Sequence, residues 1–215
     1  MDIRELAKEE FGAALALSLR VFQTYEAPDY GPQGAETFCA SIRDEAYLAG
    51  LRIYGAFEAE ALIGVLATRS GGTHIALFFV EGAYHRRGVG KQLFLRACRD
   101  NPAEQMTVNS SPFAVEVYRR LGFRETDAEQ TVDGIRYTPM RCQTGRADCP
   151  CKRTHCERHG SCVLCRAHHA DDKQSPPACE RPTREERREL RRQKHAEREK
   201  KITAAPAHAA LPPKK

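Results

Sequence analysis

The sequence LFFVEGAYHRRGVGKQLFLRACR, residues Leu77–Arg99, decides how the rest of the chain is organised. It begins with an apolar stretch typical of a buried strand, Leu77–Val80, and ends with apolar residues spaced as on one face of a helix. Between them lies a basic, glycine-containing turn, His85–Lys91. Backbone N–H groups at a helix start are free to bind anions, and the helix dipole adds positive potential. Because Gly88 and Gly90 carry no side chain there, we predict that this turn binds a diphosphate.

Two common phosphate-binding motifs do not fit this turn. A Walker loop requires a glycine at the position of His85 and a serine or threonine at the position of Gln92. A dinucleotide-binding fingerprint requires a third glycine, where Leu93 stands. An ordinary surface turn between a strand and a helix, without a ligand, is the remaining alternative.

The turn resembles the acyl-CoA-binding turn of the GNAT acetyltransferases. That turn reads Gln/Arg-x-x-Gly-x-Gly/Ala and follows a strand that ends in valine. Here the pattern is His85-x-x-Gly88-x-Gly90 after Val80, with histidine as a departure at the first position. The family's contacts at that position come largely from the backbone, so the resemblance tolerates the change.

A second stretch, VNSSPFAVEVYRRLGF at 108–123, resembles the second conserved GNAT block, an asparagine followed by Ala-x-x-x-Tyr-x-x-x-Gly-Phe. It predicts a short strand ending at Asn109 and then a helix, with Ser111 as N-cap and Pro112 at the first helical position. Both blocks occur in the family's order. The predicted fold class is therefore α+β: the GNAT acyl-CoA N-acyltransferase fold, with a mixed, mostly antiparallel central sheet and flanking helices.

The rest of residues 1–142 fits that fold. Apolar periodicity and turn signals predict, in order, a strand at 2–6, helices at 11–22 and 35–42, strands at 51–59, 61–69 and 73–80, and a closing hairpin at 123–132 and 135–140. The segment TYEAPDYGPQ, 24–33, is predicted to be a linker because it contains Pro28 and Gly31.

The resemblance also implies which residues contact acetyl-CoA, the acyl-donating co-substrate. Backbone groups of Phe78 and Val80 would pair with the pantetheine amides inside a V between two splayed strands. Asn109 would bond the cofactor near its thioester, and Tyr118 would be the acid that serves the departing thiolate. The alternative for Tyr118 is a purely packing role. The pyrophosphate would be held by the backbone amides of Arg86, Arg87, Gly88, Val89, Gly90 and Lys91.

The general base stays open at this stage. His74 is the only titratable side chain in the strand at 73–80, and at ~3.3 Å per residue it lies ~20 Å from the thioester end. Glu81 is at the correct end but is expected to face solvent. Glu26 lies in the linker that would form the floor of the acceptor pocket. The two alternatives for the base are therefore the Glu26 carboxylate and a base that acts through a bound water molecule. Two tyrosines and two carboxylates in this linker suggest a polar, cationic acceptor.

Charge is distributed unevenly along the chain. Residues 1–142 carry a net charge of −3 and residues 183–215 carry +6, within the overall +5. No stretch approaches the ~18 apolar residues of a membrane span, and the start, MDIRELAKEE, lacks the plan of a secretory signal. We therefore expect a cytoplasmic enzyme without membrane contact.

Six of the nine cysteines lie between Cys149 and Cys179, which indicates a separate module at 143–182. Its few apolar residues cannot form a core, and without an export signal disulfides are disfavoured. We therefore predict a zinc-binding module, ahead of an iron–sulfur cluster or redox-active thiols. Six cysteines exceed one four-coordinate site, so the ligand set stays open. The candidate ligands are Cys149, Cys151, Cys156, Cys162, Cys165, His168 and Cys179.

The last part, 183–215, begins with mixed Glu and Arg/Lys residues that predict a solvated helix to Lys201, opened by a capping box of Thr183 and Glu186. Its final dozen residues are low in complexity and are expected to be disordered. The predicted function is an acetyl-CoA-dependent N-acetyltransferase that acts on an amine by direct attack in a ternary complex. The alternative is a nucleic-acid- or ribosome-associated protein that binds through the cysteine module and the basic tail.

Overall fold

The fold is described from a computed structural model, in which residues 1–170 and 175–203 are placed. An 8-stranded sheet runs in the order β1-β2-β3-β4-β5-β8-β6, and β7 pairs with β8. All pairings are antiparallel except that of β4 with β5. The strands are β1 (Asp2–Glu5), β2 (Arg52–Glu58), β3 (Ala61–Arg69), β4 (His74–Val80), β5 (Gln105–Ser110), β6 (Arg124–Glu125), β7 (Gln130–Val132) and β8 (Ile135–Gln143).

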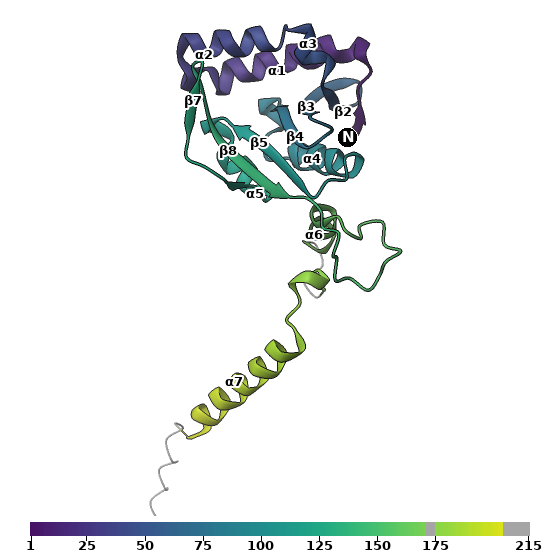
Figure 1. Cartoon of the computed structure of the whole chain (residues 1–215), viewed down its shortest axis with the longest axis vertical. Helices are drawn as coiled ribbons and strands as arrows, with labels where there is room; N and C mark the ends of the chain where they lie inside the picture. The colour runs from purple at the N-terminus through teal and green to yellow at the C-terminus, as the bar shows by residue number, and fades with distance from the viewer. Residues whose placement is uncertain (171–174, 204–215) are drawn as a thin grey trace, which may run out of the picture.

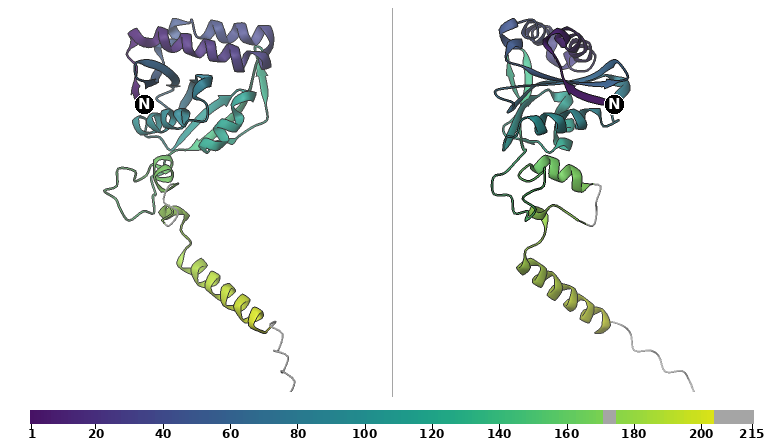
Figure 2. Two further views of the ribbon diagram at one scale, coloured as in Figure 1. Left: turned by 180° about the vertical axis from the view of Figure 1, so that it is seen from behind. Right: turned by 90° about the vertical axis from the view of Figure 1, so that its right-hand side faces the viewer.

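Helices cover both faces of this sheet (Figures 1 and 2). Two lie together on one face, α1 (Phe11–Tyr25) and α2 (Ala27–Ser41), and α3 (Glu45–Ala49) follows them. On the other face lie α4 (Val89–Asp100) and α5 (Val115–Leu121). Each face has its own buried apolar cluster. The predicted α+β fold with a mostly antiparallel sheet is confirmed.

The parallel pair β4 and β5 separates soon after it starts. The two strands are paired only at His74 with Thr107 and at Ile75 with Val108. Beyond this point β4 stays paired with β3 up to Val80, and β5 stays paired with β8. The strands therefore part toward their carboxyl ends and leave an opening between them, as the resemblance implies.

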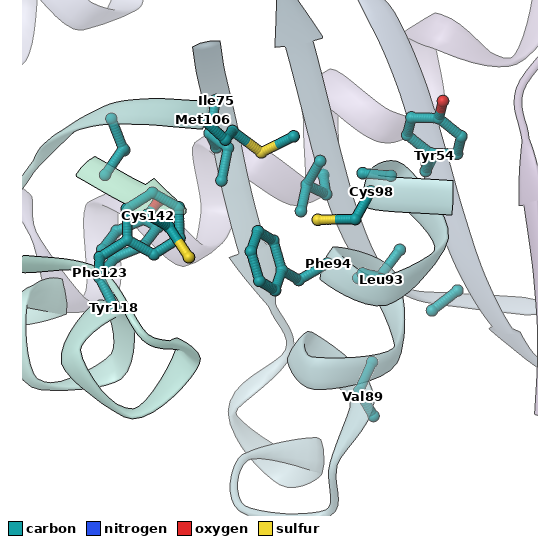
Figure 3. Packing of buried hydrophobic residues seen from close by; sticks show 14 of the residues in the cluster. Tyr54, Ile75, Val89, Leu93, Phe94, Cys98, Met106, Tyr118, Phe123 and Cys142 are labelled. Atoms are coloured by element: carbon teal, nitrogen blue, oxygen red, sulfur yellow. The ribbon is translucent and has the colours of Figure 1, made fainter. Parts of the chain in front are cut away.

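The apolar face predicted for α4 is buried as expected. Val89, Leu93, Phe94, Ala97 and Cys98 are all at most 4% exposed. Figure 3 shows Leu93 and Phe94 pointing into the core, where the Phe94 ring lies 5.4 Å from that of Phe123. Burying a side chain of this size contributes about 1.5–3 kcal/mol. This packing fixes where the first turn of α4 sits.

The predicted linker at 24–33 is wrong, because most of it is helical. Only Glu26 separates α1 from α2, and α2 is interrupted at Gly31, whose φ is +68° and ψ is 177°. Pro28 lies in the first turn of α2, where the missing N–H group costs no intrahelical hydrogen bond. The proline that suggested a loop is thus a helix starter, and Gly31 supplies the kink.

The predicted strand at 123–132 is also interrupted. Residues between β6 and β7 leave the sheet at Asp127, whose carboxylate accepts from the Ala128 N–H at 2.8 Å and from the Gln130 side chain at 3.0 Å. Such local bonds of an aspartate compete with the strand ladder. In contrast, β8 is longer than predicted and ends at Gln143, the first residue of the module predicted at 143–182.

The C-terminal part begins with α6 (Cys162–Ala170), which lies against α4, and Val163 packs on the core. The last helix, α7 (Arg184–Thr203), points away from the sheet domain (Figure 1). The predicted capping box is present, because Thr183 and Glu186 exchange hydrogen bonds of 2.7 and 3.2 Å. The expected disorder of the final dozen residues falls on 204–215, outside the described residues. No helix among the described residues is long and apolar enough to cross a membrane.

Candidate active site

A cavity of about 430 Å³ opens where β4 and β5 part. Its wall is formed by the end of β4, the turn before α4, α5 and the junction of α1 with α2. Most of the residues predicted to act in catalysis or to bind acetyl-CoA therefore line one space. They are Glu26, Phe78, Val80, Arg86, Gly88, Val89, Gly90, Lys91 and Tyr118. Arg87 and Asn109 are not among the lining residues.

The turn before α4 has the geometry of an anion site. Gly88 is the N-cap with φ of +82°, and its carbonyl accepts the first helical bond, from the Gln92 N–H at 3.1 Å. The N–H groups of Val89, Gly90 and Lys91 precede that bond, so the helix itself gives them no acceptor. A Cβ at Gly90 would lie 3.1 Å from the Phe78 ring. The turn thus combines free donors with a close approach that a side chain would obstruct.

His85, the departure from the family pattern, ties the turn to β4 with its side chain. Its Nε2 donates to the Val80 carbonyl oxygen at 2.8 Å. Its ring lies 5.0 Å from that of Tyr25, which in turn lies 5.3 Å from that of Phe113. The resemblance implied that contacts at this position come largely from the backbone. Tyr25 and Phe113 were not predicted, because the three rings come from three separate elements and share no periodicity.

Tyr118 is both a core residue and a cavity residue. It is 5% exposed, and its ring lies 5.9 Å from that of Phe78. The ring of Phe123 lies 5.3 Å away on the core side (Figure 3). Burial raises the pKa of its phenol well above the ordinary value, and the charges of Glu26 and Tyr30 raise it further. The phenol is therefore protonated at neutral pH, which a proton donor requires.

Glu26 is the carboxyl group at the other side of the cavity. Its backbone ends α1 and starts α2, and its side chain is half-buried. Burial raises the pKa of this carboxyl to about 7; the Ser111 hydroxyl opposes the increase and the charge of Asp29 adds to it. A carboxyl that titrates near pH 7 is suited to exchange protons at neutral pH.

The other two groups weighed as bases lie elsewhere. His74 is at the paired end of β4, with its Nδ1 2.9 Å from the Thr107 hydroxyl, and burial lowers its pKa to about 4. Glu81 forms an ion pair with Arg20. Neither is among the residues that line the cavity.

The comparisons with known proteins agree with this geometry. The family model for the acetyltransferase (GNAT) domain matches residues 26–144, more than half of the chain. The chain belongs to the GNAT acetyltransferase family. It is therefore an acyltransferase, and the matched range contains both sequence blocks and the whole cavity except Val21 and Tyr25.

Solved structures support the same GNAT fold. A GCN5-related N-acetyltransferase from Rhodopseudomonas palustris is 22% identical with a TM-score of 0.57, and the match covers 66% of this chain and 94% of that one. The apo form of YjaB from Escherichia coli is 20% identical with a TM-score of 0.52, covering 65% of this chain and 94% of that one. No curated protein matches the chain.

Two residues predicted to contact acetyl-CoA, Arg87 and Asn109, have side chains outside the cavity. The Arg87 guanidinium lies over the Tyr84 ring, 5.2 Å from its centre. Asn109 is exposed on β5, between the buried Val108 and Ser110, and pairs with Pro139 of β8. The predicted contact of Arg87 is its backbone amide, which the position of the guanidinium does not test.

The structure does not support the predicted zinc site. Cys162, Cys165 and His168 lie on α6, with the two cysteines one turn apart. The other proposed ligands come from the turns at 149–161 and from the short helix Ala178–Glu180. In the part of the chain that is described, no group of three or more His, Cys, Asp or Glu residues is placed to hold a metal ion. The cysteines are free thiols. Burial and then the neighbouring thiols of Cys179, Cys149, Cys151 and Cys156 raise the pKa of Cys165.

Proposed function

We propose that the protein is an acetyl-CoA-dependent N-acetyltransferase that transfers the acetyl group to an amine within a ternary complex. One observation carries the proposal: a single cavity combines the free amides of the α4 turn, the protonated phenol of Tyr118 and the near-neutral carboxyl of Glu26. Each of these groups meets one need of the reaction: to bind the diphosphate, to serve the leaving thiolate and to deprotonate the amine.

The co-substrate would lie along the open edge of β4. From Ala76 onward this strand has no partner in β5, so its free backbone groups can pair with pantetheine amides. The diphosphate would then meet the amides of Val89–Lys91. At Val80 the His85 side chain already occupies the carbonyl, so pantetheine would pair there through the N–H group or displace the imidazole. Asn109 remains a proposed contact near the thioester.

In the reaction, the acceptor arrives as an ammonium group and gives one proton to the Glu26 carboxylate. The free amine nitrogen then attacks the thioester carbonyl carbon, so that the N–C bond forms and the C–S bond breaks. Tyr118 donates its proton to the departing thiolate, and the amide product releases its extra proton. The two side chains return to their starting states by proton exchange with water, and the balance is one amide, one free CoA thiol and one proton.

An acceptor screen tests this function directly. Purified full-length protein would be incubated with acetyl-CoA and single primary amines, peptides or protein acceptors, and the free CoA thiol would be followed. We expect release that depends on the acceptor and produces an equal amount of acetylated amine. Thiol release that is the same with and without every acceptor would reject N-acetylation.

The other predicted partners and the location stay predictions. α7 carries both signs of charge, and Arg192 and Glu189 form an ion pair of 3.7 Å on its surface. No described contact identifies a nucleic acid for this helix, zinc for the cysteine module or a compartment for the chain.

A further inference from the structure

Ser111 occupies a helix N-cap position without capping the helix. It precedes the short helix Pro112–Ala114 and α5, with φ of −57° and ψ of 155°, but its side chain makes no cap hydrogen bond. Its Oγ is buried without a hydrogen-bond partner, and the residue is 5% exposed. A serine at this position normally bonds to the backbone of the next turn. A buried hydroxyl left unpaired is unfavourable, so its retention here needs another reason.

The neighbouring serine provides the contrast. Ser110 is 1% exposed, and its Oγ donates to the Ser111 carbonyl at 2.9 Å. Two adjacent serines are therefore buried, but the hydroxyl of Ser110 is satisfied by the backbone and that of Ser111 is not.

The surroundings of the Ser111 hydroxyl are the junction of α1 and α2. It lies close enough to the carboxyl of Glu26 and the phenol of Tyr30 to lower the pKa of both groups against the effect of their burial, although it forms no hydrogen bond with either of them. The unsatisfied hydroxyl thus lies beside the carboxyl group that the reaction needs in its ionised form.

Other charged or titratable groups face Glu26 from each neighbouring element. Asp29 and Tyr30 come from α2, and Tyr118 comes from α5. Arg136 of β8 acts on Tyr30, and its Nη1 donates to the Asp29 carbonyl at 3.2 Å. The charge of Asp29 raises the pKa of Glu26, whereas the nearby Ser111 hydroxyl lowers the pKa of Glu26.

We propose that Ser111 is the positioning residue of the acceptor site, whose hydroxyl donates to the ionised carboxylate of Glu26 and fixes the direction of its free oxygen. This inference rests on the proposed function of Glu26 as the base. One carboxylate oxygen would accept from Ser111, which leaves the other to take a proton from the incoming ammonium group. Ser111 does not line the cavity, so it acts through Glu26 and not on the substrate.

The test follows the titration of Glu26 in the full chain by carbon NMR of glutamate labelled at the carboxyl carbon, with the Glu26 signal assigned by Glu26→Gln. Ser111→Ala should raise the observed pKa of Glu26 by about one unit, the size expected when a hydrogen bond to a charged group is lost. Ser111→Thr keeps a hydroxyl and should titrate close to the parent. Ser110→Ala is the matched control and should leave the Glu26 titration unchanged.

The outcomes separate this inference from the proposed function. If Ser111→Ala titrates like the parent, or if Ser110→Ala shifts Glu26 as much, the positioning role is rejected. If the hydroxyl merely supports the helix start, Ser111→Ala should lower the melting temperature while the Glu26 titration stays in place, which also rejects the role. Acetyl-CoA binding measured on the same samples reports on the proposed function itself, because its absence in the parent rejects the enzyme assignment whatever Glu26 does.

Discussion

Replacing Glu26 by glutamine removes the carboxyl group whose pKa the fold raises to about 7 from an ordinary 4.5. A raised pKa means that the folded state disfavours the carboxylate relative to the unfolded chain. The contribution of Glu26 to the free energy of unfolding of the parent is therefore fully present at pH values below about 4.5. It is lost as the pH rises from there through 7. Glutamine cannot ionise, so the variant does not undergo this loss.

The size of the effect follows from the two pKa values. A difference of about 2.5 units corresponds to about 3 kcal/mol above pH 7 and to less than about 0.5 kcal/mol at pH 4.5. Because the side chain is half-buried, this figure is an upper limit. We expect Glu26→Gln to gain stability relative to the parent by up to about 3 kcal/mol between pH 4.5 and pH 8.

The assay is urea unfolding of parent and variant at both pH values, with Glu36→Gln as the control. Glu36 is an exposed carboxylate on the same helix, α2, so its replacement controls for the loss of one negative charge from the surface. Acetyl transfer should fall by about 10²-fold or more in Glu26→Gln, within the range of general base catalysis. A stability difference independent of pH for Glu26→Gln would refute the argument that this carboxyl is poised near neutrality.

Two further predictions concern the leaving group and the tail. Tyr118→Phe keeps the ring that packs on Phe78 and Phe123, so acetyl-CoA affinity should stay within about twofold of the parent's. The variant loses the phenolic proton, so kcat should fall by about 10²-fold or more. A kcat close to the parent's would make Tyr118 a packing residue only. Removal of residues 183–215 should leave acetylation of small amines intact, because α7 points away from the sheet domain (Figure 2). If the tail binds nucleic acid, the same removal should abolish an affinity that falls steeply with salt, and a parent without such binding would exclude that partner.

The parts of the site that the sequence predicted are those carried by contiguous patterns. The turn at 85–91 and the buried face of α4 follow from glycine spacing and helical periodicity, and Tyr118 follows from its place in the second block. Each depends on residues within a few turns of one another, so local rules were sufficient.

The parts that were missed depend on contacts between distant elements. The cluster of Glu26, Tyr30 and Ser111 forms only when the α1–α2 junction packs against the end of β5, and the linker prediction hid that junction by treating Pro28 as a breaker. Ser111 was predicted as an N-cap by its residue type, but its hydroxyl is left without that bond. The zinc prediction rested on cysteine spacing, which does not determine whether the thiols converge.

The central claim is that the turn before α4 binds acetyl-CoA, and isothermal calorimetry of acetyl-CoA with Gly90→Glu tests it most directly. The new carboxylate would stand where the diphosphate meets the amides, at a position where even a Cβ lies 3.1 Å from Phe78. Gly12→Glu adds the same group on the exposed face of α1, where a Cβ meets nothing within 4 Å, and serves as the control. We predict binding by the parent and by Gly12→Glu, and no detectable binding by folded Gly90→Glu. Equal affinity of all three proteins would contradict the assignment of this cavity.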